Sequence, residues 1–318
     1  MAIKTLADLR DAPSPAWIWD GVLLPSHITL LSSAPKAGKT TFVAYMLRAM
    51  WTEDTYIHGD IRPAPTLVIS EEADTLIAKR ADALGFSEMW PIGWLTPEPG
   101  RTWEHLLAYI KKYTMLYHNP VVILDTLSRH WGIDDENDNA KVEKALNPLI
   151  DIARSTGAAL LLVHHTRKSG GYGGAASRGG SAILGAVDIS IELTRLAKDD
   201  KTACRRLDGF SRYEETPGSE EPLVIKLTPG GYVLATEEDK RAADILSDST
   251  IRQWLQANPG WWTADSISAA SSMPLRTVRE ALGALVVTDD IRQQGSGRKG
   301  SPYTYCAVSE EEDNELNG

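Results

Sequence analysis

Residues 28–42, ITLLSSAPKAGKTTF, join a short apolar run to a small polar loop and then to an amphipathic stretch. The run 28–31 is rich in residues that favour β-strands, and the stretch 39–52 has the spacing of an α-helix. A buried strand that turns through a loop into a helix is the opening unit of many α/β domains. This stretch therefore predicts an α/β fold.

The loop carries the phosphate-loop pattern G-x-x-x-x-G-K-[ST] over residues 33–40. The pattern is met at Gly38, Lys39 and Thr40, while Ser33 stands at the place of the first glycine. Such a loop binds phosphates through backbone N–H groups and a lysine, and its hydroxyl binds Mg²⁺. We therefore expect ATP and Mg²⁺ as ligands, with the nucleotide held by Pro35, Lys36, Ala37, Gly38, Lys39, Thr40 and Thr41.

The alternation of strand and helix continues to about residue 235. Further apolar runs lie at 66–69, 121–124, 159–163 and 187–191, and helical patterns lie at 74–84, 101–116 and 140–155. Nearly continuous Val, Ile and Leu is typical of strands buried on both faces, so we expect a mainly parallel sheet. The later runs 205–213, 223–227 and 232–234 are separated by Pro/Gly turns and predict an antiparallel extension.

Carboxylates follow two of the predicted strands. Asp125 ends one of them, in the position where a Walker B aspartate binds Mg²⁺ together with Thr40. A strand-terminal aspartate is also common as a turn residue, and the presence of Lys39 favours the metal role. Glu71 and Glu72 follow another strand, and hydrolysis needs a base that orients the attacking water. Ordinary surface charge is the alternative for either glutamate.

The last part of the chain has a different rhythm of short helices followed by a hairpin. Residues 237–243 read as a charged bridge; Ser249 and Thr263 can each cap a helix, and Pro274 suits the first turn of a third helix ending near Val286. Two strand-like runs, 291–294 and 303–308, then flank a glycine-rich basic tip at residues 295–300. Three helices followed by a β-wing predict a winged helix-turn-helix domain.

Composition and charge bound the function. The chain has 318 residues, is 42% hydrophobic and 24% charged, and carries a net charge of −10, which argues against a nucleic-acid coat protein. Much of the negative charge lies in the acidic tail 310–318, while residues 246–309 are slightly basic, so local DNA binding is compatible with the total. Two cysteines cannot form a disulfide framework. No apolar run would cross a bilayer, and we expect a cytoplasmic protein with no membrane partner.

These motifs together give a resemblance to a known family. The matching blocks, in order, are PKAGKTT (35–41), ISEE (69–72) with Arg80 and ALG (83–85), LDTLSR (124–129), DENDN (135–139), LVHHTRK (162–168) and ASRGGS (176–181). Over about residues 15–235 the chain resembles the RecA-like ATPases, and within them the RepA-type replicative helicases of plasmids and phages, relatives of the DnaB helicases.

The resemblance implies roles for individual residues. It favours Glu71 as the water-activating carboxylate, because Arg80 then keeps the family's nine-residue offset. His165 falls where DnaB relatives place a glutamine that senses the γ-phosphate; a metal pair with His164 is the alternative, and adjacent strand residues point to opposite faces, which disfavours it. RepA-type helicases can carry an arginine finger where this sequence has Asp188, so we expect that role at Arg212, with an ordinary exposed arginine as the alternative.

Basic residues suggest two nucleic-acid contacts. Lys168 and Arg178 flank the glycines at 170–174, in a loop that faces the central channel in RecA-like rings, although a surface loop is the alternative. In the predicted winged helix, Arg276 and Arg279 lie on one face of the third helix and Arg298 and Lys299 lie on the wing. Packing against a neighbour or binding protein is the alternative for that domain.

We accordingly expect an ATP hydrolase that acts as a DNA helicase or translocase on single-stranded and forked DNA in plasmid or phage replication. It would work as a hexameric homo-oligomer, with a replication initiator or a primase as further partners. The expected domains are a RecA-like ATPase domain at 1–236, a linker at 237–245, a winged-helix domain at 246–309 and an acidic tail at 310–318. The alternative is a non-motor, ATP-switched DNA-binding regulator or assembly factor with the same core; a metabolic kinase is a weaker third option.

Overall fold

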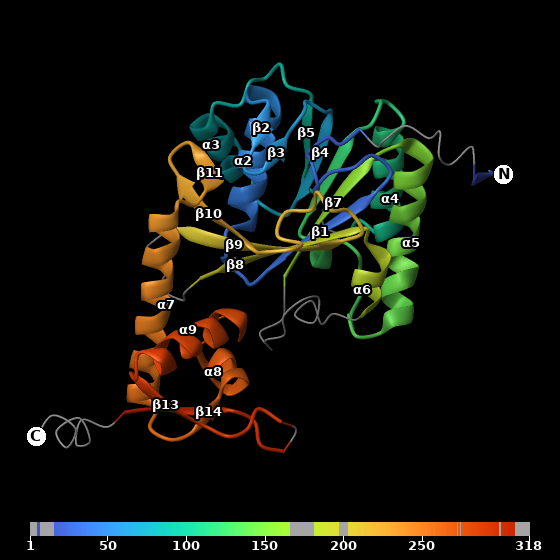
Figure 1. Cartoon of the computed structure of the whole chain (residues 1–318). Coiled ribbons are helices and arrows are strands. Elements are labelled where there is room, and N and C mark those ends of the chain that lie inside the picture. The colour runs from blue at the N-terminus through green and yellow to red at the C-terminus, as the bar shows by residue number, and fades with distance from the viewer. Residues whose placement is uncertain are drawn as a thin grey trace, which may run out of the picture.

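The largest element of the fold is a nine-stranded sheet with the order β11-β10-β9-β8-β1-β7-β6-β4-β5 (Figure 1). The computed structural model describes residues 5–6, 16–98, 100–165, 181–196, 203–271, 273, 275–298 and 300–308. The strands of this sheet are β1 (Ile28–Ser33), β4 (Thr66–Ser70), β5 (Ile92–Leu95), β6 (Val121–Asp125), β7 (Ala159–His165), β8 (Ile189–Arg195), β9 (Cys204–Ser211), β10 (Leu223–Thr228) and β11 (Gly231–Leu234).

Six of these strands run parallel, and β9, β10 and β11 add an antiparallel extension to the edge at β8. The predicted mainly parallel α/β fold is confirmed. β1 lies between β8 and β7, and the chain departs from it to strands on either side. In open α/β sheets, ligands bind at such a switch point, beyond the carboxyl ends of the strands. The phosphate loop follows β1 at this place.

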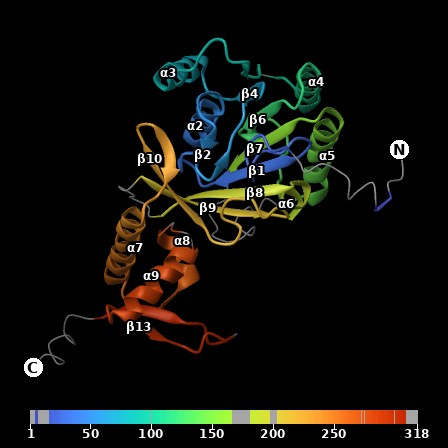
Figure 2. The same ribbon diagram turned by 45° about the horizontal axis from the view of Figure 1, so that its top comes forward.

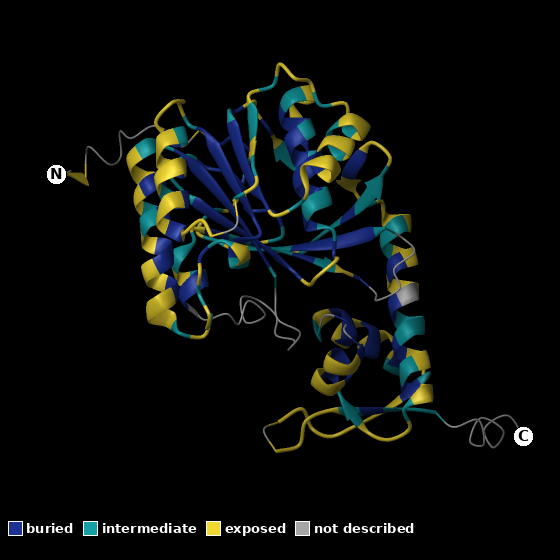
Figure 3. Cartoon of the chain, turned by 180° about the vertical axis from the view of Figure 1, so that it is seen from behind, coloured by how far each residue is buried: buried dark blue, intermediate teal, exposed yellow. Residues whose placement is uncertain are grey.

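Helices cover both faces of the sheet (Figures 1 and 3). One face packs on α2 (Lys39–Thr52) and the other on α4 (Trp103–Thr114), α5 (Asn139–Thr156) and α6 (Ser181–Ala186). Consecutive strand residues serve opposite faces, as Leu30 packs toward α5 while Leu31 packs toward α2. Because both faces are dry, the central strands need apolar residues at every position, which explains the unbroken runs in the sequence.

The sequence predicted most of these elements within a few residues. The helices α2 and α3 (Asp74–Leu84) have the expected bounds, and β8 begins two residues later than expected. The edge strand β5, the short helix α6, the 3-10 helix η1 (Leu127–Arg129) and the small hairpin of β2 (Thr55–Tyr56) and β3 (Gly59–Asp60) were not predicted. The β5 segment reads IGWL, and its glycine and exposed tryptophan break the apolar run that marks the other strands.

Residues 237–308, here called the C-terminal unit, have a core of their own. The unit contains α7 (Glu237–Ala257), α8 (Ala264–Ser271), α9 (Leu275–Val287) and a small antiparallel sheet of β12 (Trp262–Thr263), β14 (Thr304–Ala307) and β13 (Ile291–Gln294). Its buried residues include Ile251, Leu255, Val278, Leu282 and Tyr305. Figures 1 and 2 show α9 on the side of the unit that faces the large sheet, with β13 and β14 on the far side.

The start of α7 corrects the sequence prediction. We expected a charged linker at 237–245 and a helix capped by Ser249, but a single helix begins at Glu237. Thr236 caps it, since its side chain accepts from the Asp239 amide while the Asp239 side chain accepts from the Thr236 amide. This reciprocal cap fixes the helix start more strongly than a weak apolar pattern could. The predicted cap at Thr263 is present, with its hydroxyl accepting from the Ser266 amide over 3.2 Å.

Pro274 and the acidic tail 310–318 lie outside the described residues. Among the residues that the structure describes, no helix has the length and apolar content needed to cross a membrane.

Candidate nucleotide site

The phosphate loop turns from β1 into α2 through an unusual backbone. Gly38 is the N-cap of α2 and has a φ of 108°, and Lys36 also has a left-handed φ of 62°. A β-carbon at Gly38 would lie 3.0 Å from the Tyr232 hydroxyl, so glycine is needed here both for the torsion and for the space. The first amides of α2 have no partners within the helix, which makes this turn suited to phosphate.

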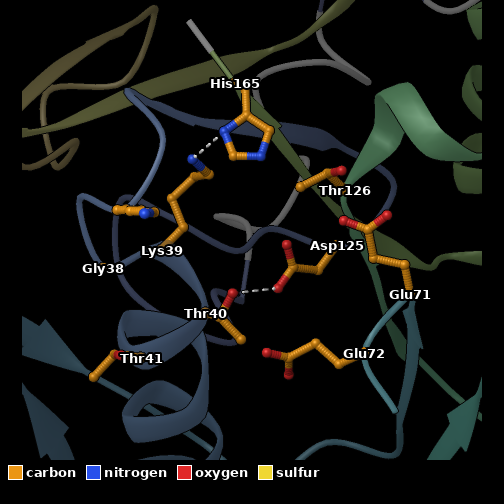
Figure 4. A pocket seen from close by; sticks show the side chains of 10 residues that line it. Gly38, Lys39, Thr40, Thr41, Glu71, Glu72, Asp125, Thr126 and His165 are labelled. Carbon is orange, nitrogen blue, oxygen red and sulfur yellow. Dashed lines mark hydrogen bonds between the residues drawn. The ribbon is translucent and has the colours of Figure 1, made fainter.

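A pocket of about 330 Å³ opens above this turn (Figure 4). Its lining residues come from the phosphate loop and from the ends of β4, β6 and β7: Lys36, Gly38, Lys39, Thr40, Thr41, Glu71, Glu72, Asp125, Thr126 and His165. The structure thus brings Glu71, Asp125 and His165 to the phosphate loop, as expected for carboxyl ends of neighbouring parallel strands. Pro35 and Ala37 belong to the same loop but do not line the pocket. Thr126 lines it without having been singled out in the sequence.

Lys39 is almost fully buried and has polar partners on two sides. Its Nζ donates to the Ser33 hydroxyl over 2.8 Å and to the Ser33 carbonyl oxygen over 3.1 Å, and it lies 2.9 Å from His165 Nδ1. Burial lowers the pKa of Lys39 to about 8, and the charge of Asp125 opposes that shift. Ser33, the departure from the phosphate-loop pattern, therefore serves as a hydroxyl that holds the lysine.

Thr40 and Asp125 form the expected magnesium pair. The Thr40 hydroxyl donates to Asp125 Oδ2 over 3.0 Å. Asp125 is 7% exposed, and burial raises its pKa, while the hydrogen bond from Thr40 and the charge of Lys39 act against that rise. A hydroxyl and a carboxylate side by side are hard oxygen donors, which are the ligands that Mg²⁺ prefers. The residues present therefore fit this cation.

Glu71 and Glu72 both line the pocket, and each pairs with a different arginine. Arg80 makes two hydrogen bonds to Glu72, with Nη2 at 2.9 Å from Oε1, whereas Glu71 pairs with Arg129 over 2.7 Å. The offset of nine residues pointed to a link between Arg80 and Glu71, and the structure instead links Arg80 to Glu72. Because Glu72 is held by a two-pronged guanidinium contact, Glu71 is the more adjustable carboxylate. Its assignment as the base remains a prediction.

The two histidines at the end of β7 point to different surroundings. His164 is buried near Glu136, with Nε2 at 3.7 Å from the carboxylate, while His165 reaches the pocket. Burial, followed by the positive charges of Lys39 and Arg129, lowers the pKa of His165, so the ring is neutral at pH 7 and can accept from Lys39. Among the described residues no group of His, Cys, Asp and Glu side chains is arranged to hold a metal ion in the manner of a zinc site.

Arg212 lies far from the phosphate loop of its own chain. It directly follows β9, whose last residue Ser211 pairs with Ile189 at the start of β8. This is the amino end of β1, opposite to the end that carries the phosphate loop. The side chain is exposed. Asp188, at the position of the alternative finger, instead accepts a hydrogen bond from the Ile28 amide over 2.9 Å. A role for Arg212 at the nucleotide requires a second chain.

The residues predicted to touch nucleic acid are only partly described. Arg276 pairs with Glu280 over 2.7 Å, and Arg279 lies 3.6 Å from Asp265. Arg298 is exposed at the tip of the β13–β14 hairpin. Lys168, Arg178 and Lys299 lie outside the described residues.

Glu280 also contacts the large sheet, because Arg206 of β9 donates to it over 3.2 Å while holding Asp208 over 3.0 Å. The exposed side of α9 is therefore turned toward β9.

The fold and this site define a P-loop nucleoside triphosphatase of the RecA-like kind. A model of an AAA domain family matches residues 3–171, which is more than half of the chain, and the chain belongs to this family. Nucleotide binding is what the family implies.

Solved structures with a similar fold include the ATPase domain of a helicase, with 13% identity and a TM-score of 0.49 over 66% of this chain and 85% of that one. The RadB recombinase has 14% identity and a TM-score of 0.47 over 67% of this chain and 92% of that one. No curated protein matches the sequence.

Proposed function

We propose that the protein is an ATP-driven DNA helicase or translocase of the RepA type. The observation that carries the ATPase part is the convergence of Lys39, Thr40, Asp125 and Glu71 in one pocket at the carboxyl ends of β1, β4 and β6. The phosphate-loop amides and Lys39 would hold the phosphates of ATP, and Thr40 with Asp125 would hold Mg²⁺. The cation, when bound, neutralises charge on the phosphate oxygens.

The protein's own groups have separable tasks in hydrolysis. Lys39 supplies a positive charge in a dry site, where its interaction with phosphate is stronger than in water. Glu71 accepts a hydrogen bond from the attacking water and orients it. His165 contacts Lys39 over 2.9 Å and stands at the end of β7, so it is suited to report the state of the outer phosphate to the segment that follows that strand.

A ring of subunits is part of this proposal. Arg212 is exposed on the edge of the sheet opposite to its own phosphate loop, so it is of use in catalysis only at a neighbour's nucleotide. An arginine finger supplied in trans raises hydrolysis rates by about 10³–10⁵. We propose a hexamer in which each Arg212 serves the adjacent site, with single-stranded DNA contacted by the basic residues Lys168 and Arg178.

The C-terminal unit is proposed to be a winged helix that binds duplex DNA or a replication partner such as an initiator or a primase. Three helices followed by a two-stranded hairpin support this assignment, as does the exposed Arg298 at the hairpin tip. The pairing of Arg276 with Glu280 favours contact with β9 in the observed arrangement, so the hairpin is the part of the unit that is free to reach DNA.

Strand displacement on a forked DNA substrate tests the motor. We expect ATP-dependent unwinding by the wild-type chain and none by Lys39→Ala. A protein that binds DNA and hydrolyses ATP but displaces no strand would instead be the switch-type regulator or assembly factor with the same core. Hydrolysis that single-stranded DNA does not stimulate would also count against a translocase.

A further inference from the structure

Two arginines that the proposed reaction does not use contact the phosphate loop from the side of the sheet. Arg195 is the last residue of β8, and Arg205 is the second residue of β9. The two strands are antiparallel, and these residues lie directly opposite one another in the ladder. Residues paired in this way project from the same face of the sheet. Both therefore stand beside the end of β1, where the phosphate loop begins.

Each guanidinium donates to a carbonyl oxygen of that loop. Arg205 Nε donates to the Ala37 carbonyl oxygen over 2.9 Å, and Arg195 Nη2 donates to the Lys36 carbonyl oxygen over 2.5 Å. Arg205 is 9% exposed, and its Nη1 also donates to the Cys204 carbonyl oxygen over 2.6 Å. Its guanidinium is thus fixed in orientation by the strand that carries it. Arg195 is exposed and forms the weaker member of the pair.

The contact with Ala37 determines the direction of a phosphate-binding amide. A trans peptide is planar, so its C=O and N–H point in opposite directions. Because Arg205 holds the Ala37 carbonyl, it also fixes the Gly38 N–H on the other side of the same peptide. Gly38 lines the pocket and caps α2. Glycine has the freest backbone of all residues, so its amide gains most from an external tie.

We propose that Arg205, assisted by Arg195, is a positioning residue of the nucleotide site. It holds the Ala37–Gly38 peptide so that the Gly38 amide is already aimed when the phosphates of ATP or ADP arrive. The tie lowers the ordering cost of binding, as preorganised donors do. The proposal rests on nucleotide binding at this pocket, which is part of the proposed function, and it adds residues that belong to no phosphate-loop or Walker motif.

The test uses the full chain with Arg205 replaced by lysine, which keeps the charge and loses the planar fork. The dissociation constant for a fluorescent ADP analogue, measured by equilibrium titration with Mg²⁺, should rise roughly tenfold, the range for a lost hydrogen bond to a charged group. The matched control is Arg48→Lys. Arg48 also donates to a backbone carbonyl, that of Gly230 over 2.8 Å, but away from the phosphate loop, so its replacement should leave the affinity unchanged.

Steady-state kinetics separates positioning from stability. Arg205→Lys should raise KM for ATP about tenfold with little change in kcat, because the amide binds phosphate in the ground state and the transition state alike. A chain that only loses stability lowers kcat through its folded fraction and keeps KM, and that result would overturn the proposal. So would wild-type affinity in a folded Arg205→Lys chain.

Two further variants keep the test decisive. If Arg205→Lys does not fold, Arg195→Ala takes its place, because this exposed side chain can be removed at little cost to the core; a several-fold loss of affinity is expected, and wild-type affinity would overturn the proposal. Lys39→Ala tests the site itself. Wild-type binding by Lys39→Ala would refute the nucleotide site, whereas lost binding there with normal binding in both arginine variants would refute only the positioning role.

Discussion

Arg205 and Arg206 are consecutive residues of β9 that contact opposite sides of the sheet. Arg205 donates to the phosphate loop at Ala37, while Arg206 donates to Glu280 of α9 over 3.2 Å. Alternation along a strand explains the divergence, since neighbouring side chains leave by opposite faces. One strand therefore touches both the nucleotide site and the C-terminal unit.

Lys39→Ala should abolish nucleotide binding, while Glu71→Gln should bind ATP normally and fail to hydrolyse it. Lys39 is buried at the phosphate loop and would contact the phosphates of the ground state, whereas Glu71 acts on the water. Loss of a positioned base typically lowers turnover by about 10²–10⁴. Equilibrium binding and phosphate release, measured on the same preparations, separate the two effects.

Glu72→Gln is the control for this assignment. Its carboxylate is bound by Arg80, so its replacement should disturb that contact and leave more turnover than Glu71→Gln does. If Glu71→Gln hydrolyses normally and Glu72→Gln does not, the catalytic glutamate is the second of the pair.

Nucleotide affinity should fall as the pH rises above 8. Burial lowers the pKa of Lys39 to about 8, so the free protein loses this positive charge above that pH, whereas bound phosphate favours the charged form. Binding then takes up a proton, and the dissociation constant should rise up to about tenfold for each pH unit above 8. Between pH 6.5 and 7.5 this lysine is protonated in both states and contributes no dependence. Titration calorimetry in buffers of different ionisation enthalpy would count the proton directly.

Lys39→Arg is the comparison variant, because guanidinium stays ionised throughout this range. If it binds nucleotide, its affinity should be constant from pH 7 to 9.5. An equally steep profile in this variant would assign the titration to another group.

The core of the site could be predicted because its geometry is local. Gly38, Lys39 and Thr40 are fixed by one strand, one loop and one helix, and Asp125 reaches them because parallel strands end at the same edge of the sheet. The tie from Arg205 to Ala37 joins residues 168 positions apart, and no local pattern indicates it. The start of α7 was missed for a different reason. Thr236 and Asp239 are a visible capping signal, but the charged stretch after them has too few apolar residues to suggest a helix.

Mixing two inactive chains should restore part of the activity if Arg212 acts in trans. Arg212→Ala keeps a complete phosphate loop, and Lys39→Ala keeps a complete finger, so interfaces that combine the intact halves regain both. Arg212 lies at the amino end of the sheet, which excludes contact with its own nucleotide. Hydrolysis by the mixture, compared with each variant alone, measures the effect. No recovery in chains shown to assemble together would contradict a finger at this position.

The last prediction concerns the contact between α9 and β9. Glu280 is half-exposed and binds both Arg206 and Arg276, so Glu280→Gln removes the charge that joins α9 to the sheet and takes this anionic partner from Arg276. We expect the full chain to bind duplex DNA more tightly after this change. If Arg276 then contacts one phosphate, the slope of log affinity against log salt should steepen by about 0.9.

Two variants frame that result. Arg298→Ala removes the exposed charge of the hairpin tip and should flatten the salt slope by about 0.9. Glu237→Gln, which breaks an exposed ion pair with Lys240 at the start of α7, removes the same charge away from α9 and should change neither affinity nor slope. If Glu237→Gln raises the affinity as much as Glu280→Gln does, general charge and not the α9 contact is responsible. If neither Glu280→Gln nor Arg298→Ala alters duplex binding, the C-terminal unit does not contact DNA through α9 or the hairpin, and a protein partner becomes the better assignment for it.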